Sequence, residues 1–187
     1  MSTYDFYFWK DFFSQEQIEN IYAIKDENSY EELGDKGATS DNGHNLKDVT
    51  KVNSVEYRYL IDNFKLLNEQ IQITNRKNYG FNIDEIFATD TVFFNEYDKE
   101  SRYDWHKDGS NHPLHDYKFT IIINSSLDNY EGGDFEIFTL GGVLKIPQLN
   151  SFGSVIMFNS SIIHRVTPVT EGQRRSIVYW RIGPNFV

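Results

Sequence analysis

The chain has 187 residues, contains no cysteine and carries a formal net charge of −10 at pH 7. This length allows one domain with a sizeable core and no cross-links, and the lack of cysteine excludes disulfides, iron–sulfur clusters, thiolate zinc sites and cysteine nucleophiles. The acidic balance argues against duplex nucleic acid as a partner, because phosphate binding requires a basic surface. The sequence shows neither a signal-like N-terminus nor an apolar stretch of membrane-spanning length, so we expect a soluble, cytoplasmic protein without a membrane partner.

The N-terminal part of the chain predicts helices separated by a polar segment. Ser14 followed by Gln17 is typical of a helix N-cap with a capping box, and apolar residues follow at helical spacing. From about Glu27 to Asn53 the chain turns polar and Gly-bearing, which predicts a long surface loop, either disordered or acting as an active-site lid. Residues 54–75 return to helical spacing and predict the longest helix. We therefore expect helical support over about residues 12–76.

From residue 81 onward, short β-branched and aromatic runs alternate with turn residues. Eight runs predict strands, at residues 90–97, 102–107, 117–124, 134–139, 143–146, 154–158, 164–168 and 174–182. The 15 Phe and 12 Tyr, with only 4 Pro, suit a β-rich interior. We predict a mainly β fold with N-terminal helices, a two-sheet jelly roll of eight antiparallel strands supported by two or more helices. Its core covers about residues 90–182 of a single domain that spans residues 1–187.

Two metal-ligating residue types stand two positions apart in Trp105-His106-Lys107-Asp108. Alternate side chains of a strand leave the same face, so the His106 imidazole and the Asp108 carboxylate can converge on one ion. His164, in a second apolar, β-favouring segment, is suited to supply a third ligand. Two imidazoles and one carboxylate leave other coordination positions open, which is typical of non-haem Fe(II) oxygenases. Taken singly, His106 and Asp108 would be a surface pair and His164 a core histidine.

Alternation along the last predicted strand puts Arg174 and Ser176 on one face, together with Val178 and Trp180. Arg175 falls on the other face. Both faces mix polar and apolar residues, so the alternation alone does not identify the inner one. Taken alone, Arg174 and Arg175 could be a charge pair that protects a sheet edge.

The other histidines, His44, His112 and His115, lie in polar or turn-rich segments and are expected to be solvated. His112 and His115 could instead border a substrate entrance, together with residues 27–53 and 108–116. The Trp105 and Lys107 side chains are expected to point away from the ion.

The order of these residues resembles that of the Fe(II)/2-oxoglutarate-dependent dioxygenases. Five segments carry the resemblance to their prolyl 4-hydroxylase-like branch: Asn95-Glu96-Tyr97, Trp105-His106-Lys107-Asp108, Tyr130-Glu131-Gly132-Gly133-Asp134-Phe135, Gly153-Ser154-Val155-Ile156-Met157-Phe158 and the run from His164 to Arg174. That last run is similar to the pattern of the PKHD-type hydroxylases. The likeness covers about residues 90–182.

This resemblance implies a double-stranded β-helix that binds Fe(2+) through His106, Asp108 and His164. It also implies 2-oxoglutarate as co-substrate, O2 as oxidant and ascorbate as a reductant that keeps the iron ferrous. Arg174 would hold the far carboxylate of 2-oxoglutarate. Ser176 could add a hydroxyl donor and Tyr97 could line the same pocket, although both could equally be packing residues.

Two functions therefore remain open. The first is a dioxygenase that hydroxylates a C–H bond in a peptidyl, prolyl-type or small-molecule substrate. The second is a jelly-roll module that binds a metal without turnover, and a hydrolytic zinc enzyme is a weaker third option. Arg174 argues against the last two, because neither has a use for a carboxylate anchor.

Overall fold

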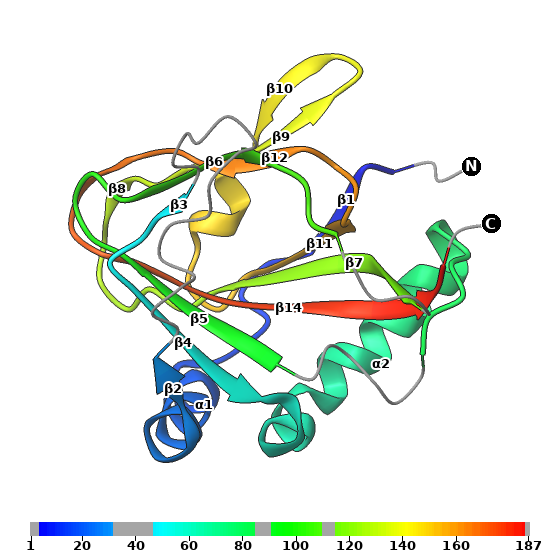
Figure 1. Ribbon diagram of the computed structural model, residues 1–187, viewed down its shortest axis with the longest axis horizontal. Coiled ribbons are helices and arrows are strands. Elements are labelled where there is room, and N and C mark those ends of the chain that lie inside the picture. The colour runs from blue at the N-terminus through cyan, green and yellow to red at the C-terminus, as the bar shows by residue number, and fades with distance from the viewer. Residues whose placement is uncertain (1–3, 32–46, 85–90, 110–114, 186–187) are drawn as a thin grey trace.

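The computed structural model describes residues 4–31, 47–84, 91–109 and 115–185. Figure 1 shows two sheets that face each other, with the two helices packed on the outer side of the larger sheet. All strand pairs in the described residues are antiparallel. The predicted mainly β jelly roll with N-terminal helices is therefore confirmed.

The larger sheet has seven strands. In spatial order they are β1 (Phe6–Trp9), β11 (Val155–Asn159), β7 (His115–Asn124), β14 (Arg174–Pro184), β5 (Thr91–Tyr97), β4 (Lys51–Glu56) and β2 (Tyr30–Glu31). The smaller sheet has five strands. They are β10 (Gly142–Lys145), β9 (Phe135–Thr139), β12 (His164–Val166), β6 (Arg102–His106) and β3 (Lys47–Asp48), and a further pair joins β13 (Val169–Glu171) to β8 (Glu131–Gly132).

Each of the eight predicted strands has a counterpart, in β5, β6, β7, β9, β10, β11, β12 and β14. The start predicted at Asp90 lies outside the described residues. Six further strands, β1, β2, β3, β4, β8 and β13, were not predicted. Four of these are only two or three residues long, which is too short for an alternating pattern to be visible.

Helix α1 (Gln15–Asn28) begins at the predicted N-cap. The Ser14 hydroxyl accepts a hydrogen bond from the Gln17 backbone N–H, and the Gln17 side chain accepts one from the Ser14 N–H, so the capping box is confirmed. Ile18 and Ile21 are buried one turn apart and pack the helix against the sheet.

The expectation of a loop over residues 27–53 was wrong for its described parts. The segment contains the end of α1, then β2, β3 and most of β4, while residues 32–46 lie outside the described part of the chain. The helix expected from Ser54 begins later, because residues 51–56 pair with β5 along their whole length as β4. A short 3-10 helix (Tyr57–Tyr59) follows, and then α2 (Ile61–Asn78), which is the longest described helix as predicted. Among the described residues, neither helix is long and apolar enough to cross a membrane.

Two apolar clusters fix the larger sheet in place. One lies between this sheet and the helices, where Phe64 of α2 stacks on Tyr179 of β14 with ring centroids 5.0 Å apart. The other lies between the two sheets and includes Tyr97, Ile122 and Phe135. Because β14 is held on its helix side, its opposite face is presented at a fixed position to the space between the sheets.

Candidate metal centre and active site

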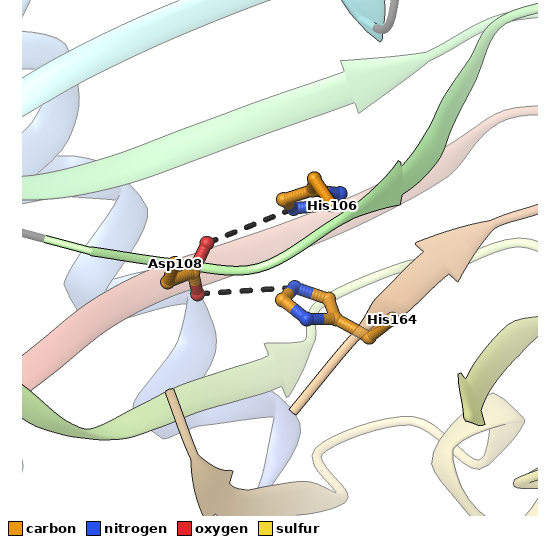
Figure 2. A group of neighbouring side chains, drawn as sticks. All are labelled: His106, Asp108 and His164. Carbon is orange, nitrogen blue, oxygen red and sulfur yellow. Dashed lines mark ion pairs between the residues drawn. The ribbon is translucent and has the colours of Figure 1, made fainter. Parts of the chain in front are cut away.

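Two histidines and one aspartate meet where β6 ends and the neighbouring strand β12 begins. His106 is the last residue of β6, His164 is the first residue of β12, and the two are paired directly across the smaller sheet. Asp108 approaches both of them (Figure 2). Its Oδ1 lies 3.6 Å from His106 Nε2 and its Oδ2 lies 3.8 Å from His164 Nε2. One potential ligand atom from each residue lies within 4.8 Å of the other two, close enough for one ion to contact all three.

Asp108 reaches this position by a route that strand alternation did not predict. Strand β6 ends at His106, so Asp108 belongs to the loop that follows. Its backbone N–H donates to the Ser160 carbonyl oxygen over 3.0 Å, which ties this loop to the turn before β12. The predicted convergence of His106 and Asp108 is present, but a hydrogen bond between two loops produces it.

Hydrogen bonds to the backbone set the tautomer of both imidazoles. His106 Nδ1 lies 2.7 Å from the Asp104 carbonyl oxygen, and His164 Nδ1 lies 2.9 Å from the Ile162 carbonyl oxygen. A carbonyl only accepts, so each Nδ1 carries a proton, and Nε2 is the ring atom directed at the Asp108 carboxylate. Two imidazole Nε2 atoms and one carboxylate fit a divalent transition-metal ion that accepts nitrogen and oxygen ligands.

Aromatic side chains hold the two imidazole rings. The Tyr103 ring stacks on His106 with centroids 3.5 Å apart, and Phe158 meets His164 edge-on at 4.7 Å. His164 is 3 % exposed. The rings are therefore fixed before any ion binds, which reduces the entropy lost on binding.

A cavity of about 590 Å³ opens between the two sheets beside this group. Arg174, Ser176, Val178 and Trp180 of β14 line it, so they occupy the inner face of that strand. Arg175 lies on the other face, where its Nε donates to Gln173. The grouping predicted from strand alternation is thus present, and the structure identifies which face is inside.

The Arg174 guanidinium is buried in the wall of this cavity at 2 % exposure. Its Cζ lies 5.1 Å from the Tyr97 ring centroid, and its Nη1 donates to Ser176 Oγ over 3.3 Å. Within the described part of the chain, no carboxylate lies at ion-pair distance from this guanidinium. A buried cation is costly without a counter-charge, so this end of the cavity suits an anionic group of a ligand.

The side chains of Arg165 and Lys107, each next to a histidine of the group, point in different directions relative to the cavity. Arg165 points away from the cavity, where it forms a 2.7 Å ion pair with Glu136 and lies over the Trp105 ring. Lys107 was expected to point away from the ion, but it contributes to the cavity lining. The loop after β6 is not strand, so alternation does not apply there.

The other histidines were expected to be solvated or to border a substrate entrance. His44 and His112 lie outside the described residues. His115 begins β7, opposite Pro184, and is not among the residues that line the cavity. Of residues 108–116, Asp108 and Gly109 line the cavity.

Among the cavity residues that sequence reasoning did not assign are Thr120, Trp180 and Asn95. Thr120 of β7 and Trp180 of β14 both donate hydrogen bonds to Asp108 Oδ2. Asn95 of β5 is 5 % exposed, and within the described residues its Oδ1 has no hydrogen-bond partner. Thr120 carried a signal, as a polar residue before three consecutive isoleucines, and Trp180 shared the predicted face of Arg174.

The sequence is similar to known proteins over this region. Residues 92–181 match the model of the 2OG-Fe(II) oxygenase superfamily. A PKHD-type hydroxylase of Pseudoalteromonas atlantica is 26 % identical over 178 residues, which cover 87 % of this chain and 75 % of that protein. Another, from Alteromonas mediterranea, is 35 % identical over 95 residues, covering 46 % of this chain but only 41 % of the relative.

Solved structures share the fold at low sequence identity. A Pseudomonas putida prolyl-4-hydroxylase has a TM-score of 0.68 at 12 % identity, covering 98 % of this chain and 95 % of that chain. A prolyl hydroxylase from Trichoplax adhaerens, in complex with a hypoxia inducible factor peptide fragment, has a TM-score of 0.65 at 16 % identity, covering 97 % and 84 %. Taken with the fold and the His-Asp-His group, these similarities relate the chain to the 2OG-Fe(II) oxygenase superfamily, whose model matches just under half of its residues.

Proposed function

We propose that the protein is a non-haem Fe(II)- and 2-oxoglutarate-dependent dioxygenase. It would convert 2-oxoglutarate and O2 to succinate and CO2 while hydroxylating a C–H bond of a second substrate. The observation that carries this proposal is the buried Arg174 guanidinium, which lines the same cavity as the His106, Asp108 and His164 group. A structural ion has no use for a buried cation nearby, whereas a dicarboxylate that also contacts the metal uses both.

His106 and His164 would bind the iron through Nε2, and Asp108 would bind it through its carboxylate. When bound, Fe(II) supplies the redox chemistry that activates O2, and ascorbate is the proposed reductant that keeps it ferrous. These three side chains would leave other coordination positions of the ion open for the co-substrate.

Arg174 would hold the far carboxylate of 2-oxoglutarate by two parallel charge-assisted hydrogen bonds. Ser176 Oγ accepts a hydrogen bond from Arg174, so its own proton remains available for the same carboxylate. The Tyr97 ring under the guanidinium supports it through a cation–π contact. These assignments give Tyr97 and Ser176 roles in positioning the co-substrate as well as in packing.

The second substrate would enter beside an aromatic wall made of Phe93, Tyr117 and Trp180. Burial, with a smaller contribution from the Asp108 carboxylate, raises the pKa of Tyr117, so its hydroxyl is neutral at physiological pH. Such a wall suits an apolar part of a peptidyl, prolyl-type or small-molecule substrate. The prolyl-4-hydroxylase from Pseudomonas putida and the peptide complex of the Trichoplax enzyme, which share this fold, support the peptidyl choice. A single domain over residues 1–187 and a cytoplasmic location stay predictions from the sequence.

The test is 2-oxoglutarate turnover by the iron-loaded protein in the presence of candidate peptides. We expect succinate formation that requires Fe(II) and O2, together with an added oxygen atom on the substrate detected by mass spectrometry. Arg174→Gln should lose succinate formation, and Arg175→Gln, which changes the neighbouring residue on the opposite strand face, should retain it. A folded protein that binds metal but forms no succinate with any candidate would instead support a metal-binding module without turnover.

A further inference from the structure

The two oxygens of the Asp108 carboxylate have different surroundings. Oδ2 accepts a hydrogen bond from Thr120 Oγ1 over 2.6 Å and a second from Trp180 Nε1 over 2.8 Å. Oδ1 faces His106 Nε2 at 3.6 Å, beyond hydrogen-bond distance. The two oxygens therefore differ: Oδ2, which lies 3.8 Å from His164 Nε2, accepts from two protein donors, whereas Oδ1 faces His106 and accepts from none among the described residues.

Both donors come from the larger sheet, whereas Asp108 follows a strand of the smaller sheet. Thr120 of β7 and Trp180 of β14 are paired directly across the sheet, which places their side chains side by side on the inner face. Thr120 Oγ1 also lies 3.0 Å from Ser160 Oγ, and the Ser160 carbonyl accepts from the Asp108 N–H. One hydrogen-bond network thus joins the two sheets at the ligand.

Packing fixes the direction of the Trp180 N–H. The Tyr117 ring stacks on the indole with centroids 5.0 Å apart at 18°, and Phe93 meets it edge-on at 5.6 Å. The indole is held on two sides, so its N–H does not need to be ordered when an ion binds.

From this geometry we infer that Thr120 and Trp180 are positioning residues that make Asp108 bind the metal through Oδ1 alone. A carboxylate that turned to bind through both oxygens would have to give up at least one of the two hydrogen bonds to Oδ2 and would occupy one more coordination position. By holding Oδ2, the two donors keep that position open for the co-substrate or O2. This inference rests on the metal site of the proposed function, and it assigns these residues no contact with the ion itself.

The test measures metal binding rather than turnover. Affinity for Mn(II) is determined by electron paramagnetic resonance of the free ion, and Co(II) absorption reports the coordination number. Trp180→Phe keeps an aromatic ring and removes the donor, and Thr120→Val keeps the shape and removes the hydroxyl. Each should weaken Mn(II) binding by roughly 10- to 100-fold, the usual effect of losing a hydrogen bond to a metal ligand, and should change the Co(II) spectrum. Thr120→Ser restores the hydroxyl and should recover most of the affinity.

Trp105→Phe is the matched control, because Trp105 lies beside His106 in sequence but packs outside the cavity against Arg165 and Phe138. It should bind both ions like the wild type. Thermal melting of each variant without metal checks that it is folded, and Thr120→Ser provides a second folded variant for the comparison. If folded Trp180→Phe and Thr120→Val bind Mn(II) within about twofold of wild type, with unchanged Co(II) spectra, the inference is wrong while the proposed function stands. If the wild type binds neither ion, both are wrong.

Discussion

The Arg174 guanidinium lies over the ring of Tyr97, with its Cζ 5.1 Å from the ring centroid, and both side chains are 2 % exposed. This pair forms a buried cationic wall in the cavity that also contains the His106, Asp108 and His164 group. A carboxylate that reaches this wall displaces little protein structure, because the guanidinium is already oriented by Tyr97 and Ser176.

Arg174→Lys tests whether this wall binds the co-substrate. A lysine keeps the charge but loses the planar pair of donors, so we expect the Kd for 2-oxoglutarate to rise by roughly tenfold or more, with Mn(II) affinity close to wild type. Isothermal titration of the metal-loaded protein measures both constants. Arg175→Lys on the opposite face should change neither. A similar 2-oxoglutarate Kd in Arg174→Lys and wild type would contradict the assignment.

The buried side chain of Asn95 should lower the stability of the free protein but strengthen ligand binding. Its amide is buried in the cavity wall, directly across from Ser176, and within the described residues its Oδ1 has no hydrogen-bond partner. An unpaired buried acceptor costs about 1–3 kcal/mol. We expect Asn95→Val to raise the melting temperature of the free protein but to weaken binding of the co-substrate or substrate, measured by titration. Lower stability combined with unchanged binding would show that Asn95 is an ordinary packing residue.

Gly153 is a position where the fold requires glycine. Its φ is +70°, and a Cβ there would collide with the Phe13 carbonyl oxygen in the segment before α1. Gly153→Ala should destabilise the protein by about 2 kcal/mol or more, from backbone strain plus the displaced segment. Gly80→Ala is the matched control, since Gly80 has a φ of +72° but no atom within 4 Å of its added Cβ. Urea unfolding compares them, and equal losses of free energy would refute the steric part of this account.

The buried hydroxyl of Tyr79 should make the stability of the protein depend on pH in the alkaline range. Burial raises the pKa of its hydroxyl above the ordinary value, with smaller contributions from Asp5 and Tyr7. The folded state therefore holds this proton more tightly than the unfolded state does. The associated stability is present below pH about 10 and is lost as pH rises from there through the folded pKa. Tyr79→Phe should flatten the decline of the melting temperature above pH 10, and an unchanged slope would contradict this cause.

The fold could be predicted where local sequence patterns carry it. Ser14 and Gln17 predicted the start of α1 because capping uses residues three positions apart. The β4 segment was mistaken for loop and helix because its structure comes from pairing with β5, some forty residues later in the chain. A spacing such as that of Val52 and Val55 does not reveal which distant strand will pair with it.

The candidate site also contains both residues that local sequence motifs predicted and residues that only tertiary structure brings in. The order of the motifs predicted His106, Asp108, His164 and Arg174 as site residues. All four line one cavity in the structure. The two donors to Asp108 depend on the register between β7 and β14, which shifts at a bulge next to Arg181 and Ile182. A register of this kind is set by tertiary packing, so Thr120 and Trp180 could not be assigned from the sequence.

The most direct test is an anaerobic titration of the metal-free protein with Fe(II) and then 2-oxoglutarate, followed by visible absorption. We expect a weak charge-transfer band that appears only when both are present, because the keto acid would chelate an iron held by His106, Asp108 and His164. Asp108→Ala, which removes one ligand, should abolish the band at the same concentrations. A folded wild-type protein that gives no band at saturating Fe(II) and 2-oxoglutarate would contradict the account.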